Sequence, residues 1–133
     1  MGKLSLKKYG YKREVALSFA NVILKTKEEL SKEGFGVLTE IDVKATLKDK
    51  LGVDYENYVI LGVCNPSLAH QALLAQKDIG LFMPCNVIVY EEDGKSFVSA
   101  MMPTIALQTV SNSVINKIAQ QAEEKLKKVV DAV

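Results

Sequence analysis

The chain has 133 residues, of which 48% are apolar and 25% are charged, a usage typical of one globular domain spanning residues 1–133. Its net charge of +1 argues against a nucleic-acid partner, because nucleic-acid-binding surfaces carry a clear basic surplus. No apolar run reaches the roughly 18 residues of a membrane span. The charged N-terminus also lacks the apolar stretch of a secretory signal, so we expect a cytoplasmic protein without a membrane partner.

The first predicted elements are a strand over residues 9–15 and a helix after it. One face of the strand carries alternating residues, namely Tyr9, Tyr11, Arg13 and Val15. Arg13 on this face indicates an edge strand or a face that is partly solvated. Ser18 is a good N-cap for a helix that runs to about Glu33. Gly34 can then take the left-handed conformation in which many helices end.

Residues 35–43 form the clearest strand pattern in the chain. One predicted face carries Phe35, Val37, Thr39, Ile41 and Val43, and the other carries Leu38, Glu40 and Asp42. Glu40 and Asp42 would lie roughly 7 Å apart, given the strand rise, and such a pair could hold a hard cation or act as acid and base. Carboxylates in this pattern more often form the solvated face of an antiparallel strand. Asp42 is also placed to cap a short helix over residues 44–51.

The next strand and helix meet at a cysteine. Residues 58–63 are apolar on both faces, which predicts a central strand. Asn65 as N-cap and Pro66 at the first helical position predict a helix that begins there and runs to about Gln76. Cys64 therefore precedes a helix N-terminus, where the positive end of the dipole favours a thiolate. A free cysteine also commonly serves as a small apolar core residue, and the sequence leaves both roles open.

The second cysteine begins the last sheet segment. Cys85 lies in the triplet Pro84-Cys85-Asn86, before two strands over residues 86–91 and 95–102. An Asp-Gly pair between these strands predicts a tight hairpin. Residues 104–113 show no firm pattern and are read as a loop or a turn of helix, and residues 115–130 have the spacing of a long amphipathic helix. Because the chain has no export signal, we expect both cysteines to be free thiols.

Three fragments, at residues 34–42, 60–66 and 84–87, read Gly-Phe-Gly-Val-Leu-Thr-Glu-Ile-Asp, Ile-Leu-Gly-Val-Cys-Asn-Pro and Pro-Cys-Asn-Val. Together they resemble the prokaryotic family called domain of unknown function 302. The resemblance implies a two-layer α+β fold with helices on one face of an antiparallel sheet, in a TATA-binding-protein-like β-α-β4-α arrangement. It also implies a homodimer, but no reaction. The family's motif residues, carried over by position, are Glu40, Asp42, Cys64, Asn65, Pro66, Pro84, Cys85 and Asn86.

Three functional hypotheses follow. In the first, the protein is a homodimeric binding module whose Cys64-Asn65 and Cys85-Asn86 turns converge, with Glu40 and Asp42, on a small ligand or a metal ion. In the second, Cys64 serves a thiol-dependent enzyme or redox protein, although the chain has no Cys-x-x-Cys pair and no motif places its histidine as a base. In the third, the protein is a purely structural dimer unit. The sequence identifies no cofactor, and it does not settle whether the two acids share a sheet edge with the two cysteines.

Overall fold

Within the described residues, one antiparallel sheet of six strands, in the order β1-β2-β6-β5-β4-β3, forms the centre of the molecule. The structure is a computed structural model that describes residues 4–6 and 9–133, so the predictions on the N-terminal residues lie partly outside it. The strands are β1 (Leu4–Leu6), β2 (Gly10–Val15), β3 (Gly36–Asp42), β4 (Tyr58–Cys64), β5 (Cys85–Glu92) and β6 (Lys95–Met101).

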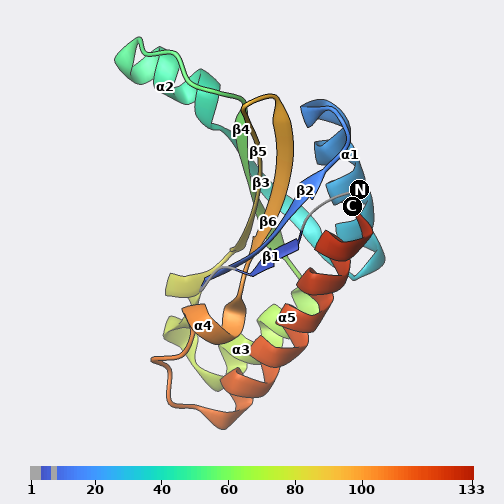
Figure 1. Cartoon of the computed structure of the whole chain (residues 1–133). Coiled ribbons are helices and arrows are strands. Elements are labelled where there is room, and N and C mark those ends of the chain that lie inside the picture. The colour runs from blue at the N-terminus through green and yellow to red at the C-terminus, as the bar shows by residue number, and fades with distance from the viewer. Residues whose placement is uncertain (1–3, 7–8) are drawn as a thin grey trace.

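The two long helices, α1 (Phe19–Lys32) and α5 (Ser113–Ala132), cover the same face of the sheet (Figure 1). The other helical segments are α2 (Val43–Leu51), α3 (Pro66–Ala75), the 3₁₀ turn η1 (Lys77–Phe82) and α4 (Pro103–Ala106). The order β2-α1-β3-β4-β5-β6-α5 confirms the predicted two-layer α+β fold and is compatible with a TATA-binding-protein-like arrangement. None of the helices in the described ranges is long and apolar enough to cross a membrane.

The main core lies between the sheet and the two long helices. Every second residue of the central strands is buried there, and the set comprises Val59, Leu61, Val63, Val87, Val89 and Val98. The helices contribute Val22, Leu30, Leu126, Val129 and Val130. Because β4 lies between β3 and β5, the prediction of a central strand over residues 58–63 is confirmed.

Three predicted helix starts are confirmed by their capping bonds. The side chain of Ser18 accepts a hydrogen bond from the Asn21 amide at 3.2 Å. Asp42 accepts one from the Ala45 amide at 2.9 Å, and Asn65 accepts one from the Leu68 amide at 3.3 Å. Each bond joins residues three apart and satisfies an amide that has no partner within its helix, which is why these starts can be read from sequence.

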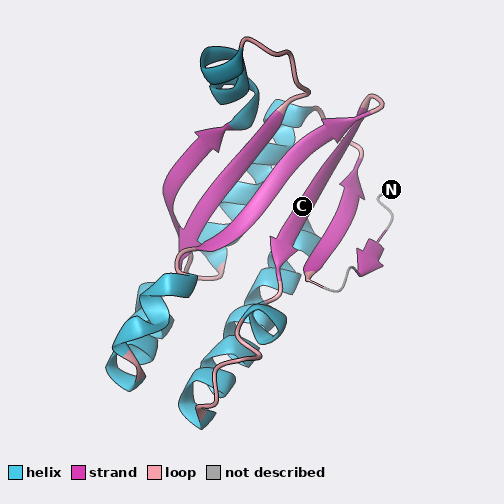
Figure 2. Ribbon diagram, turned by 90° about the vertical axis from the view of Figure 1, so that its left-hand side faces the viewer, coloured by secondary structure: helices cyan, strands magenta, loops and turns pink. Residues whose placement is uncertain are grey.

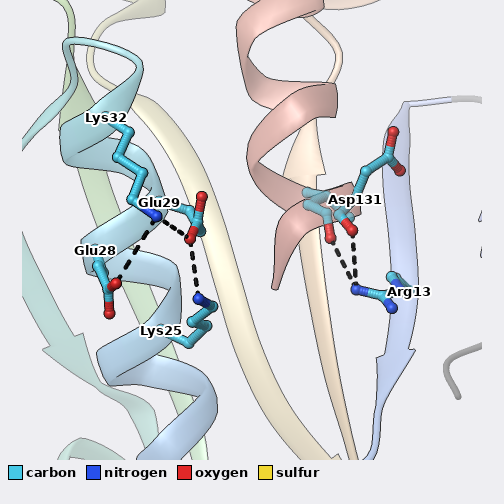
Figure 3. Close-up of polar contacts among 7 residues, drawn as sticks. Arg13, Lys25, Glu28, Glu29, Lys32 and Asp131 are labelled. Carbon is cyan, nitrogen blue, oxygen red and sulfur yellow. Dashed lines mark hydrogen bonds and ion pairs between the residues drawn. The ribbon is translucent and has the colours of Figure 1, made fainter.

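Strand β2 is not the edge strand that Arg13 suggested, because β1 pairs along its outer side. The other reading of Arg13, a partly solvated face, agrees with its half-buried position. Its guanidinium donates to the carbonyl oxygens of Val130 at 3.4 Å and Asp131 at 3.2 Å (Figure 3). A cation at this position satisfies carbonyls that the last turn of α5 leaves free, so Arg13 fixes the end of α5 to the sheet.

Strand β3 differs from its predicted pattern because the pairing with β4 shifts between Val37 and Thr39. Val37 lies opposite Val63 and Glu40 lies opposite Leu61, so both point to the face that the helices cover. The prediction that Phe35 and Val43 share one face with all the odd-numbered residues between them is therefore wrong. A bulge inserts one extra residue into a strand and reverses the alternation after it, and the hydrophobic pattern alone does not reveal that reversal.

Gly62 marks a close approach beside this bulge. A Cβ atom at Gly62 would overlap the hydroxyl oxygen of Thr39 and would lie 2.9 Å from Cγ of Pro84. By contrast, a Cβ atom at Gly36 on β3 would meet no atom within 4 Å. The structure therefore needs glycine at position 62 for space, so that β3 and the turn at Pro84 can both lie against β4.

We expect Leu61→Ala to lower the free energy of unfolding by about 2–5 kcal/mol, because it removes a fully buried side chain from the core. Urea denaturation measures the change. The matched control is Leu24→Ala on α1, where the leucine is 64% exposed and a change within about 0.5 kcal/mol is expected. Equal effects of the two substitutions would contradict the assignment of β4 as the core strand.

We expect Gly62→Ala to lower the free energy of unfolding by about 1–3 kcal/mol, the usual effect of overpacking a filled site. Gly36→Ala is the control, since its strand conformation has room for a methyl group. Thermal and urea melts of the two variants give the comparison, and the steric argument fails if Gly62→Ala is as stable as Gly36→Ala.

Candidate functional site

An apolar cavity of about 320 Å³ lies at the end of the sheet where β4 stops and β5 begins. Its walls come from α3, η1, the α4 region and the first half of α5, which extend beyond this end of the sheet (Figure 1). The lining includes Leu68, Ala72, Ile79, Met83, Leu107 and Ile118. Small-molecule sites in proteins have volumes of roughly 300–1,000 Å³ and mostly apolar walls, so the cavity has the size and character of a site for a small ligand.

Both cysteines border this cavity, together with Asn65. Cys85 lies opposite Val63 in the β4–β5 pairing, and Cys64 is the next residue along β4, so the two cysteines lie on adjacent strands one position out of register. Both are free and half-buried. The structure thus brings together three of the predicted site residues, from the end of one strand and the start of the next.

Asn65 is held in place by the backbone on both sides of the turn. Its side-chain oxygen caps α3, and its amide nitrogen donates to the carbonyl oxygen of Glu33 at 3.3 Å. That carbonyl belongs to the C-terminal end of α1, beside Gly34, whose φ angle is +81°. Asn65 therefore ties α1 to α3, and both of its polar groups have backbone partners.

The remaining predicted site residues lie elsewhere, so their expected convergence with the cysteines is wrong. Asn86 is exposed and lies opposite Gly62, which places it on the face of the sheet away from the cavity. Glu40 accepts a bond from Lys27 at 2.6 Å, and Asp42 caps α2.

The antiparallel pairing explains the position of the two acids. Gly36, at the start of β3, pairs with Cys64, and Asp42, at its end, pairs with Val59. The two carboxylates therefore lie toward the end of the sheet opposite to the cysteines. Among the residues 4–6 and 9–133, no three histidine, cysteine, aspartate or glutamate side chains are grouped to hold a metal ion, so the two cysteines and the two acids do not form one metal site.

The cavity is lined by hydrocarbon and two cysteine side chains, of which Cys85 is the more deeply affected by burial. Burial, and then the proximity of Cys64, raise the pKa of the Cys85 thiol to about 11. Cys85 is therefore protonated near neutral pH. Because the thiolate is the nucleophilic form, Cys85 has the character of a packing and contact residue rather than an activated nucleophile.

Sequence reasoning missed the walls that η1 and α4 contribute. Residues 104–113 were read as a loop or a turn of helix, and α4 (Pro103–Ala106) is such a turn, whereas η1 (Lys77–Phe82) was not predicted as a helical segment. Pro103 was a usable signal, because proline is favoured at the first position of a helix. The apolar stripe of α5 was predicted, but its first half packs in a second cluster with Leu68, Ala72 and Ile79 rather than on the sheet.

The fold and this cavity define a two-layer α+β protein with an apolar site beyond one end of its sheet. The family model described as "Domain of unknown function DUF302" matches residues 11–133, and the chain belongs to that family. It is similar to the crystal structure of an uncharacterized conserved protein DUF302 from Bacillus stearothermophilus, with a TM-score of 0.87 and 32% sequence identity over 93% of this chain and 97% of that chain. No curated protein matches the chain.

We expect the Cys85 thiol to make stability depend on alkaline pH. Its pKa is about 11 in the folded protein against an ordinary value of 9.0, so the unfolded chain loses this proton first as the pH rises. The contribution of Cys85 to stability is complete below about pH 9 and then falls, by up to about 1.4 kcal/mol per pH unit, until the pH reaches about 11.

Denaturant melts of the parent protein and of Cys85→Ala across this pH range test the effect. The variant serves as the control for lysine and tyrosine titration, which both proteins share. The difference in unfolding free energy between them should narrow toward high pH. A difference that stays constant would mean that the thiol is not buried as described.

Proposed function

We propose that the protein is a binding module that holds a small, largely apolar ligand in the cavity beside Cys64 and Cys85. The observation that carries this proposal is the cavity itself, whose walls are formed almost entirely by aliphatic, aromatic and sulfur-containing side chains. Asn65 is engaged with the backbone, which leaves the two thiols as the polar groups best placed to contact a ligand. A hydrocarbon chain or ring system suits such walls, because burying apolar surface gives about 25 cal/mol per Å².

The rim of the cavity supports the same class of ligand. Leu73 on α3 and Phe82 at the end of η1 border it with 41% and 40% of their surface exposed, and Leu38 of the β3 bulge borders it at 65%. Exposed apolar side chains gathered at a cavity commonly mark a ligand or interaction site. A ligand that extends from the cavity would cover these three side chains and remove their surface from water.

The chemistry of the cysteines also bears on where the module acts. Two free thiols persist in a reducing compartment, so a cytoplasmic location is part of the proposal. The neutral Cys85 thiol would offer a ligand a weak hydrogen-bond donor and a polarisable contact.

Filling the cavity tests the proposal. We expect anilinonaphthalene sulfonate, a fluorescent probe with an apolar ring system and one sulfonate group, to bind saturably and to be displaced by medium-chain alcohols. Ala69→Leu places a larger side chain in the α3 wall and should weaken probe binding about tenfold, or about 1.4 kcal/mol.

Ala20→Leu makes the same substitution at an exposed position of α1 and should bind the probe as the parent does. Melting temperatures of both variants report whether the fold is retained. Absence of saturable binding to the parent, or equal binding by Ala69→Leu and Ala20→Leu, would contradict a ligand site in this cavity.

A further inference from the structure

The sheet has a second face, which is directed away from α1 and α5 and which we call the open face. Figure 2 looks onto it, with α1 behind the sheet. Val87 and Val89 of β5 are buried in the core on the other side. Successive strand residues point to opposite sides of a sheet, so the alternate residues Asn86, Ile88 and Tyr90 point to the open face. The motif residue Asn86, which the apolar cavity does not use, therefore lies on this second surface.

A hollow of about 220 Å³ lies on the open face, over β2, β6 and β5. The strand pairing explains its position, because Ser99 of β6 lies opposite both Lys12 of β2 and Ile88 of β5. Gly10 leaves room for the side chain of Ser99, since a Cβ atom at Gly10 would lie only 3.0 Å from the hydroxyl oxygen. We call this site the lysine–asparagine hollow, and its polar side chains are Lys12, Asn86, Ser99 and Tyr9.

These polar side chains can all donate hydrogen bonds. They provide one ammonium group, one amide and two hydroxyl groups, and among the described residues no carboxylate lines the hollow. Within the ranges 4–6 and 9–133, Lys12 forms no ion pair. In the same ranges the side chains of Ser99 and Asn86 form no hydrogen bond. The hollow therefore offers a set of donors, one of them charged, that suits an anion.

Two aromatic rings hold the ammonium group of Lys12 beside the hollow. Its nitrogen lies 5.0 Å from the ring centroid of Tyr90 and 4.7 Å from that of Phe97. Such cation–π contacts stabilise the charged form of a lysine. Because an ammonium group has three N–H donors, a lysine that lies over a ring can still donate to a carboxylate. Lys12 is thus positioned in advance as the group that binds the anion.

The apolar part of the lining suits an aromatic ring. It is formed by Ile88, Met101 and the ring of Tyr90. Tyr58 and Phe97 stack on Tyr90, with centroid distances of 5.4 Å and 5.2 Å, so the edge of the Tyr90 ring is the part left for a ligand. A ring edge packs favourably against the face of another ring, and a methionine sulfur also makes favourable contacts with aromatic rings.

We propose that the lysine–asparagine hollow binds a small aromatic carboxylate. The carboxylate accepts hydrogen bonds from Lys12, Ser99 and Asn86, and the ring packs on Ile88 and Met101. The volume of about 220 Å³ lies below the roughly 300–1,000 Å³ of sites for drug-sized ligands, which favours a single ring. This site is separate from the apolar cavity, because Cys85 and Asn86 are consecutive strand residues and point to opposite faces of the sheet.

The neighbouring surface limits the charge of the ligand. A second hollow on the open face shares Ile88 and Tyr90 with the first, and Glu56, Glu91 and Glu92 line it. A second negative group on the ligand that pointed this way would be repelled by these carboxylates. The site therefore favours a monocarboxylate over a dicarboxylate or a phosphate ester.

Titration of the full chain with benzoate, followed by amide nuclear magnetic resonance, tests the proposal. We expect saturable shifts of the backbone amides of Lys12, Asn86 and Ser99, with a dissociation constant of about 1 mM. Benzamide has nearly the same shape but no charge, and it should bind at least about tenfold more weakly. Phthalate, which carries a second carboxylate on the same ring, should also bind more weakly than benzoate.

Two variants remove the proposed contacts. Lys12→Met keeps the apolar stem without the charge, and Asn86→Asp replaces an exposed donor with a carboxylate of the same shape. Each should raise the dissociation constant for benzoate at least about tenfold. The control is Lys95→Met, which removes an exposed lysine from the other end of β6 and should bind benzoate within about twofold of the parent.

Circular dichroism shows whether each variant keeps its fold, and the exposed position of Asn86 makes Asn86→Asp the variant least able to disturb it. The proposal is overturned if benzoate gives no saturable shift at about 20 mM, or if benzamide binds as tightly. Shifts confined to residues of the apolar cavity would overturn it as well. Equal affinities of Asn86→Asp and Lys95→Met would show that the hollow does not hold the carboxylate.

Discussion

The structure depends on covering one apolar face of the sheet with only two helices. The central strands present a continuous row of buried valine and leucine side chains, and burial of each such side chain contributes about 1.5–3 kcal/mol. α1 and α5 provide the covering layer. Arg13 bonds the end of α5 to β2. Asn65 bonds the end of α1 to the start of α3. The two covering helices are therefore fixed, α5 to the sheet and α1 to the helix that follows β4.

The offset of α5 along the sheet explains the cavity. With 20 residues, α5 is about 30 Å long at 1.5 Å per residue, whereas the strands it covers have six to eight residues and span roughly 20–27 Å. α5 is only about 3–10 Å longer than these strands, but its second half packs on the sheet, so its first half lies beyond the end of the sheet and needs a partner there. α3 and η1 supply it, and their cluster with Ile115 and Ile118 leaves space beside the ends of β4 and β5.

The two ends of the sheet differ in character. At one end the strands stop at Cys64 and start again at Cys85, and the space beside them is enclosed by apolar helices. At the other end the hairpin of β5 and β6 carries carboxylates, and α2 projects with lysines around an apolar stripe. The fold itself indicates no function, because one architecture serves many. The argument for a ligand therefore rests on the side chains around the cavity.

Much of the local structure could be predicted from sequence. Ser18, Asp42 and Asn65 act as caps as expected, and the residue types around them set the helix starts, because each capping bond joins positions only three apart. The apolar run at residues 58–63 identified the central strand, since a strand that is apolar on both faces is shielded from water on both. The placement of Cys64, Asn65 and Cys85 around one cavity also agreed with the turns that the sequence indicated.

The rest of the site was decided by tertiary structure. One extra residue in the β3 bulge turned Glu40 toward α1 and Lys27, which no hydrophobic pattern shows. Asn86 lies on the far face because successive strand residues point in opposite directions, and only the pairing of β5 with β4 shows which face Cys85 takes. Capping bonds and hydrophobic patterns depend on neighbours along the chain, so the sequence determined the helices and strands. The strand register and the walls of the cavity depend on residues that are distant in sequence, and only the folded chain brings these residues together.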